Sequence, residues 1–253
     1  MTTTPYDPKQ CEFNAVPSLR ELKVKVFSDG ADLDSIADAY QKGVVKGFTT
    51  NPTLMAKAGV INYLTFAREF LRIVPDLPVS FEVFSDDLDG MRRQALILND
   101  LAENVYVKIP VTNTQGVSCA PLIRELSAKG LKLNVTAIMT TAQVAEVVEA
   151  LAPESASFVS VFAGRIADSG RDPLPVMIRS IELCRARPGA EVIWASPRES
   201  YNIIQADQIG CHVITVTPAL LEKAPSFGKD LNAFSLDTVK MFYNDATKSG
   251  FHI

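Results

Sequence analysis

The stretch Asn104-Val-Tyr-Val-Lys-Ile-Pro-Val-Thr112 sets one lysine inside a run of apolar residues. The run predicts a short buried strand. Alternate side chains of a strand share a face, so Tyr106, Lys108 and Pro110 point one way and the aliphatic residues point the other. A lysine is seldom buried unless it is paired or used, and burial disfavours its ammonium form. A neutral amine can form a Schiff base with a ketone or an aldehyde. The alternative is a strand-end lysine whose head group reaches solvent.

Seven further runs of this kind alternate with segments of helical periodicity along the chain. The expected strands are 23–28, 47–50, 79–84, 105–110, 132–137, 158–162, 191–195 and 212–216. The expected helices are 33–42, 62–74, 88–102, 119–129, 141–151, 173–186, 200–208 and 236–248. Nearly continuous apolar strands separated by helices indicate a parallel sheet that is covered on its faces. Eight such units predict an α/β protein with a single (β/α)8 TIM barrel.

A doubly wound sheet is the alternative architecture, but it needs a glycine-rich phosphate loop after the first strand. The segment Ser28-Asp-Gly-Ala-Asp32 is not GxGxxG, which favours the barrel. Residues 1–22 are expected to form an N-terminal arm, since three prolines break any helix there. The barrel with its C-terminal helix is expected to cover residues 23–253.

Composition excludes several classes of protein. The 253 residues are 47% hydrophobic and 21% charged, as in a globular protein with a large core. A net charge of −4 favours neither nucleic acid nor an anionic membrane as a partner. No apolar run approaches the roughly 20 residues of a membrane-spanning helix, and the polar residues 1–10 do not read as a secretory signal, so a cytoplasmic location is expected. Four scattered cysteines and two histidines argue against a disulfide framework or a Cys/His metal site.

Polar residues stand at the carboxyl ends of nearly all the expected strands, where (β/α)8 barrels carry their chemistry. Each has an ordinary explanation as a cap, a turn residue or a solvated charge. Their convergence on one rim around Lys108 instead favours a site that combines an amine, carboxylates, amides and hydroxyls with an arginine-lined anion site. The residues are Asp29, Asn51, Glu82, Lys108, Asn134, Thr136, Ser160, Arg165, Ser196 and Arg198.

Six segments together resemble a known family. They are Phe27-Ser-Asp-Gly-Ala-Asp-Leu33, Gly47-Phe-Thr-Thr-Asn-Pro-Thr53, Val105-Tyr-Val-Lys-Ile-Pro110, Leu133-Asn-Val-Thr136, Phe162-Ala-Gly-Arg165 and Trp194-Ala-Ser-Pro-Arg198. In this order and at these spacings they resemble the transaldolases, including the smaller members that are similar to fructose-6-phosphate aldolase. The resemblance covers about residues 23 to 245.

The resemblance implies Schiff-base aldolase chemistry that needs no cofactor and no metal. It implies that Lys108 is the Schiff-base lysine and Asp29 the acid/base carboxylate. It implies that Glu82 and Thr136 hold a catalytic water. The substrates it implies are sugar phosphates: Asn51 and Asn134 would hold the dihydroxyacetone hydroxyls, and Ser160 and Phe162 would face the substrate. The implied phosphate grip is Arg165, Ser196 and Arg198.

Two positions distinguish the branches of this family. Aldolase-type members tend to carry Gln where Glu82 stands and Tyr where Phe162 stands, so this chain resembles the transaldolases of the pentose phosphate pathway. We expect transfer of a dihydroxyacetone unit from a ketose phosphate, of the sedoheptulose 7-phosphate or fructose 6-phosphate type, to an aldose phosphate. The alternatives are an aldolase that releases free dihydroxyacetone and a non-catalytic sugar-phosphate-binding barrel. Gly30, Asp32 and Pro197 depart from the family pattern and leave the donor and the acceptor open.

The segment from Phe234 to Tyr243 has apolar residues at helical spacing. Such a helix can pack on its own barrel. The family analogy suggests that it also contacts a neighbouring subunit, so a homo-oligomer is expected.

Overall fold

The structure of the protein is a computed structural model that describes residues 16–251. Most of the expected N-terminal arm, residues 1–15, lies outside the described residues. The chain divides into two compact units. One is Leu22–Glu222, and the described part of the other is residues 16–21 with 223–251. Each is described by itself.

The first unit is a closed barrel whose strands follow one another in chain order, each pairing in parallel with the next and the last with the first. The strands are β1 (Lys25–Asp29), β2 (Phe48–Thr49), β3 (Val79–Glu82), β4 (Val105–Pro110), β5 (Leu133–Ile138), β6 (Ser157–Val161), β7 (Ala190–Trp194) and β8 (Val213–Val216). All lie within the expected ranges to within one residue. The prediction of a single (β/α)8 barrel is therefore confirmed.

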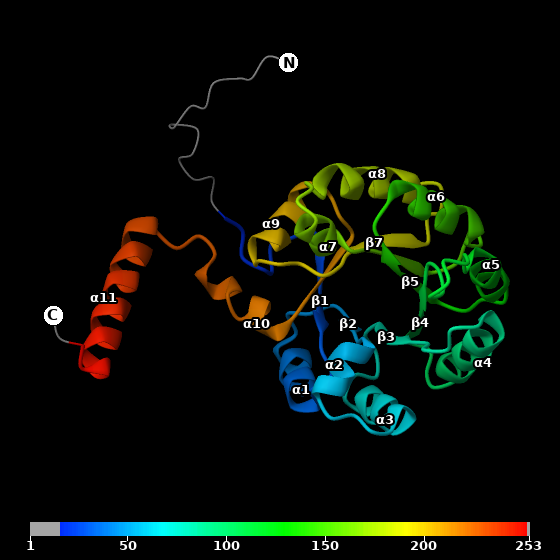
Figure 1. The fold of residues 1–253 in the computed structure, drawn as a ribbon, viewed down its shortest axis with the longest axis horizontal. Coiled ribbons are helices and arrows are strands. Elements are labelled where there is room, and N and C mark those ends of the chain that lie inside the picture. Colours follow the sequence, from blue (N-terminus) through cyan, green and yellow to red (C-terminus); the bar gives the residue numbers. More distant parts are fainter. Residues whose placement is uncertain (1–15, 252–253) are drawn as a thin grey trace, which may run out of the picture. The chain divides into compact units, whose positions relative to one another are not determined.

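The outer ring contains the helices expected between the strands (Figure 1). They are α1 (Leu33–Lys42), α3 (Tyr63–Ile73), α4 (Leu88–Asn99), α5 (Ala120–Ala128), α6 (Thr141–Ala150), α8 (Leu174–Cys184) and α9 (Tyr201–Gln208). Three short helices were not predicted, namely α2 (Pro52–Lys57), α7 (Ala163–Asp168) and α10 (Pro218–Leu221). Each begins within three residues of a strand end and is too short for helical periodicity to show in the sequence.

The two faces of β4 differ as the alternation predicts. Val105, Val107 and Ile109 are buried in the layer under the helices, whereas Tyr106 and Lys108 belong to the barrel interior. Tyr106 stacks on Phe158 of β6, with ring centroids 4.3 Å apart. Phe158 in turn meets Phe27 of β1 edge-on at 5.4 Å. These aromatic rings fill the interior one layer below the strand ends and support the residues there.

Gly47 makes this aromatic layer possible. A Cβ atom on Gly47 would lie 2.5 Å from the ring of Phe27, closer than real contacts allow. A side chain at this position would therefore push Phe27 out of the barrel interior, in which close packing leaves no room to relax.

The second unit contains η2 (Ala224–Ser226) and the long helix α11 (Leu231–Ser249). The Asp230 side chain accepts from the Ala233 amide and caps the start of α11, and Gly250 ends it in the left-handed conformation. This cap explains why α11 begins before the expected residue 236. No residue of α11 is buried, so its apolar side chains, Phe242 among them, are exposed. That this helix contacts a neighbouring subunit stays a prediction. None of the described helices is long and apolar enough to span a membrane.

Candidate active site

A cavity of about 540 Å³ opens at the carboxyl ends of the barrel strands. All the site residues expected from the sequence line it except Asn134. Its walls are formed by Asp29, Thr49, Asn51, Pro52, Thr53, Leu54, Lys57, Glu82, Lys108, Thr136, Ala137, Ser160, Phe162, Arg165, Ala195, Ser196, Pro197, Arg198, Thr215 and Thr217. The barrel thus gathers residues that lie as far apart in the sequence as β1 and β8 into one concave site.

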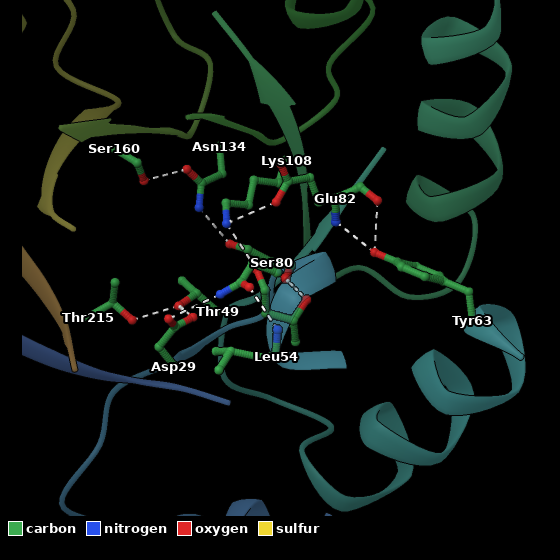
Figure 2. A network of polar contacts seen from close by, with 12 residues as sticks. Asp29, Thr49, Leu54, Tyr63, Ser80, Glu82, Lys108, Asn134, Ser160 and Thr215 are labelled. Atoms are coloured by element: carbon green, nitrogen blue, oxygen red, sulfur yellow. Dashed lines mark hydrogen bonds and ion pairs between the residues drawn. The ribbon is translucent and has the colours of Figure 1, made fainter. Parts of the chain in front are cut away.

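Lys108 is the buried amine of this site. Only 6% of its surface is exposed. Its Nζ donates to the Thr50 carbonyl oxygen at 3.0 Å and lies 3.2 Å from Glu82 Oε2 (Figure 2). A charge is retained in an interior only when it is paired and hydrogen-bonded. The structure therefore shows an enclosed, paired lysine and not a solvated one at a strand end.

Glu82 stands at the end of β3, next to Lys108 in the register of β3 with β4. Its backbone is held by Tyr63 of α3. The Tyr63 hydroxyl accepts from the Glu82 amide at 2.8 Å and donates to the Glu82 carbonyl, also at 2.8 Å. Burial raises the pKa of Tyr63 far above its ordinary value of 10.0, so this hydroxyl keeps its proton. A helix residue thus holds the backbone from which the Glu82 carboxylate extends.

Thr136 of β5 brings a hydroxyl to the same cavity. Its Oγ1 is buried and has no hydrogen-bond partner among the described residues. Buried polar atoms in proteins are nearly always paired, with protein, water or ligand. A cavity-lining hydroxyl of this kind is suited to hold a water molecule or a substrate oxygen.

Asp29 ends β1 on the other side of the cavity. It accepts from the Thr49 hydroxyl at 2.7 Å and makes a longer contact of 3.4 Å with the Asn51 amide. Thr49 also shares a hydrogen bond of 2.6 Å with Thr215. Burial raises the pKa of Asp29 above its ordinary value of 3.8, against the opposing effects of the Lys108 charge and the two hydrogen bonds. A carboxyl group that holds its proton to higher pH is suited to acid/base work.

Asn134 lies behind the cavity wall. It is fully buried, and its side chain is bonded on both sides: the amide donates to Ser80 Oγ at 2.9 Å, and the oxygen accepts from Ser160 Oγ at 2.7 Å (Figure 2). Ser160, not Asn134, reaches the cavity surface. In this structure Asn134 therefore acts on the site through Ser160 and Ser80.

The expected anion site lies at the ends of β6 and β7. Arg165 belongs to α7, and its guanidinium lies 5.8 Å from the centroid of the Phe162 ring. Arg198 follows β7 and is paired with Asp168 through two hydrogen bonds, one of them 2.8 Å long between Nε and Oδ1. Arg198 lowers the pKa of Asp168, and Arg165 adds to this effect. The two arginines and Ser196 all line the cavity.

The sequence pattern of the family described as Transaldolase/Fructose-6-phosphate aldolase matches residues 26–253. The chain belongs to the transaldolase/fructose-6-phosphate aldolase family. A probable transaldolase from Thermoanaerobacter sp. (strain X514) is 37% identical over 194 residues, which are 76% of this chain and 85% of that protein. A probable transaldolase from Exiguobacterium sp. (strain ATCC BAA-1283 / AT1b) is 36% identical over 219 residues, 85% and 97% of the two chains.

The chain also resembles solved structures of other proteins, but only in its fold. Dihydrodipicolinate synthase from Thermotoga maritima superposes with a TM-score of 0.56 at 12% identity, over 89% of this chain and 81% of that one. A monomeric dihydrodipicolinate synthase variant gives the same TM-score at 11% identity, over 89% and 79%. At these identities the similarity concerns the barrel and carries nothing about the site.

Several residues that line or contact this site were not among the predicted site residues. Thr49 and Thr215 are polar residues at strand ends, and the signal that identified the other site residues also applies to them. Tyr63 and Asp168 gave no such signal, because each lies on a helix and becomes part of the site only through its contacts. Lys57, at the end of α2, also lines the cavity, but α2 itself was not predicted.

Proposed function

We propose that this chain is a transaldolase that moves a three-carbon dihydroxyacetone unit from a ketose phosphate to an aldose phosphate through a Schiff base on Lys108. One observation carries the proposal: a buried amine lies 3.2 Å from a carboxylate, in a cavity that also holds a second carboxyl group, Asp29, whose pKa is raised. The family membership and the names of the relatives agree with this class of reaction.

In the first half-reaction the amine of Lys108 attacks the ketose carbonyl carbon. Glu82 and Thr136, with a water between them, move the protons that let hydroxide leave as water, which gives the protonated imine. Asp29 takes the proton of the C4 hydroxyl, the C3–C4 bond breaks, and its electron pair moves into the imine to form an enamine. The aldose phosphate leaves. General acid–base assistance of this kind contributes roughly 10²- to 10⁴-fold.

In the second half-reaction the enamine carbon attacks the aldehyde carbon of the acceptor. Asp29 returns its proton to the new hydroxyl, and water hydrolyses the imine to free Lys108 and the product ketose. In this proposal Ser160 and Asn51 hold the hydroxyls of the three-carbon unit, and Asn134 supports Ser160 through their hydrogen bond. In this proposal Arg165, Ser196 and Arg198 bind the phosphate, the arginines by charge-assisted hydrogen bonds.

The second candidate is an aldolase that releases free dihydroxyacetone. Release requires a proton at the enamine carbon. Phe162 brings a ring without a hydroxyl to the cavity, and such a ring has no acidic proton to donate. This supports transfer over release. We further propose that the enzyme works in the cytoplasm as a homo-oligomer in carbohydrate metabolism.

Borohydride reduction in the presence of fructose 6-phosphate tests the proposal. We expect an irreversible mass increase that maps to Lys108 and is absent from Lys108→Met. Lys132→Met is the matched control, because Lys132 precedes β5 and does not line the cavity; it should retain the adduct. Ketose cleavage should continue beyond a single turnover per site only when an aldose phosphate acceptor is added. An adduct-free wild-type protein would falsify the Schiff base, and steady release of dihydroxyacetone without an acceptor would assign the aldolase reaction instead.

A further inference from the structure

β2 and β3 differ in length, and the difference leaves one rung of their ladder unmade. β2 has two residues and β3 has four. The last rung joins the Thr50 amide to the Ser80 carbonyl at 3.2 Å. In a continued parallel ladder the next hydrogen bond would run from the Glu82 amide to the Thr50 carbonyl. The chain instead leaves the sheet through Asn51 and Pro52, and proline cannot donate to a ladder.

Both groups of this missing rung have other partners. The Glu82 amide donates to the Tyr63 hydroxyl at 2.8 Å, and the Thr50 carbonyl accepts from Lys108 Nζ at 3.0 Å. A phenolic hydroxyl both donates and accepts, so Tyr63 also satisfies the Glu82 carbonyl. The Tyr63 hydroxyl therefore occupies the place that a further residue of β2 would take (Figure 2).

The Tyr63 ring is itself fixed. It meets Phe81 edge-on at 6.4 Å and Phe84 in a tilted arrangement at 5.5 Å. The hydroxyl is thus presented to β3 by a ring packed against residues on either side of Glu82, so loss of the hydroxyl alone would leave this packing in place.

We propose that Tyr63 is a positioning residue for Lys108. By taking the Glu82 amide it leaves the Thr50 carbonyl to the lysine amine, and by holding both backbone groups of Glu82 it keeps the carboxylate 3.2 Å from the same amine. Tyr63 does not line the cavity. It acts on Lys108 through the backbone of Glu82 and the carbonyl of Thr50. The catalytic part of the inference rests on the proposed function; the hydrogen-bonding part does not.

Tyr63→Phe removes the hydroxyl and retains the ring. Tyr40→Phe is the matched control. Tyr40 lies on α1 away from the cavity, and its hydroxyl donates to Asp76 at 2.8 Å. Amide hydrogen exchange tests the hydrogen bonds between Tyr63 and the Glu82 backbone without any substrate. We expect exchange at Glu82 to quicken by about tenfold in Tyr63→Phe, as for loss of a hydrogen bond worth about 1.4 kcal/mol, and to stay unchanged in Tyr40→Phe. Unchanged exchange at Glu82 in Tyr63→Phe would overturn the inference, whatever the enzyme does.

Kinetics test the consequence for the reaction. We expect kcat to fall roughly 10- to 100-fold in Tyr63→Phe, while the KM for the ketose phosphate stays within about twofold of wild type. The reason is that misplacement of a reacting group slows the chemical step and leaves phosphate binding unchanged. In a Glu82→Gln background the same substitution should change kcat by less than about threefold, because the two residues act as one unit. Fully additive losses, or a kcat within twofold of wild type, would refute the positioning role. A wild-type enzyme that traps no imine would refute the proposed function and this kinetic consequence. The exchange result would still decide whether Tyr63 holds the Glu82 backbone.

Discussion

A Cβ atom on Gly164 would lie 1.5 Å from the carbonyl oxygen of Ser196. No side chain fits at this point. The contact brings the first turn of α7, which carries Arg165, directly against the end of β7. Ser196 itself has a φ of 60°, a left-handed conformation that is uncommon outside glycine and recurs at functional sites. The position of Arg165 relative to Ser196 is therefore set by backbone contact between α7 and the segment that follows β7.

Gly164→Ala should separate α7 from the segment that follows β7. Because the clash involves backbone, we expect a stability loss of about 1–3 kcal/mol or more and a rise of at least tenfold in the KM for phosphorylated ketoses. Thermal unfolding and steady-state kinetics measure the two effects. Gly189→Ala is the control, since its Cβ would meet the Ser155 carbonyl at 2.5 Å, outside the cavity. It should lose stability and keep its KM. Equal KM values in the two variants would contradict this role of Gly164.

Asp29 should make stability depend on pH in a direction that is unusual for a carboxylate. In the unfolded chain it ionises near 3.8, whereas burial raises its pKa in the folded state. Between the two values the folded protein holds a proton that the unfolded chain has lost, so stability falls as the pH rises through this window. Asp29→Asn cannot ionise, so it should unfold at a higher temperature than wild type at pH 8 and show no such advantage near pH 3. It should also lose activity by roughly 10²- to 10⁴-fold.

Asp32→Asn is the control with the opposite sign. Hydrogen bonds from Ser35 lower the pKa of Asp32, which caps α1 and is exposed. Its contribution to stability is present above 3.8 and is lost as the pH falls, so the substitution should lower the unfolding temperature at pH 8. If thermal scans from pH 3 to 8 showed Asp29→Asn unfolding below wild type at pH 8, the assignment of Asp29 as the buried acid would be wrong.

The barrel and most of its site could be predicted because both depend on local patterns. Strands such as β4 are marked by apolar runs, and site residues such as Lys108 and Glu82 by a polar group where the core would not accept one. The rest depends on contacts between elements. Tyr63 belongs to a helix whose periodicity says only that one face is buried, and nothing local connects it with Glu82. The enclosure of Asn134 by Ser80 and Ser160 likewise requires three strands in register.

Short helices escaped prediction for a related reason. α2 and α7 each have six residues, which is less than two helical turns. Their formation depends on the strand ends that precede them: Asn51 caps α2 by accepting from the Leu54 amide at 3.0 Å. α7 starts where Gly164 meets β7. α2 carries the cavity residue Lys57, and α7 carries Asp168, the partner of Arg198, so the omission also concealed these two residues.

Thr136 should separate stability from activity. Its buried hydroxyl has no partner among the described residues, and replacement of an unpaired polar group by an apolar group of similar shape is neutral or stabilising. Thr136→Val should therefore unfold at the same free energy as wild type or a slightly higher one, yet trap the imine roughly 100-fold more slowly, because proton relay through this hydroxyl is lost. Denaturant unfolding and the rate of borohydride trapping report the two quantities.

Thr49→Val gives the contrast within the same cavity. Thr49 donates to Asp29 at 2.7 Å and bonds to Thr215 at 2.6 Å, so its loss leaves two buried polar groups without this partner and should cost about 1–3 kcal/mol. If Thr136→Val were destabilised as much as Thr49→Val, the Thr136 hydroxyl would have to be bonded within the folded protein. If Thr136→Val instead kept both its stability and its trapping rate, Glu82 alone would move the protons of imine formation.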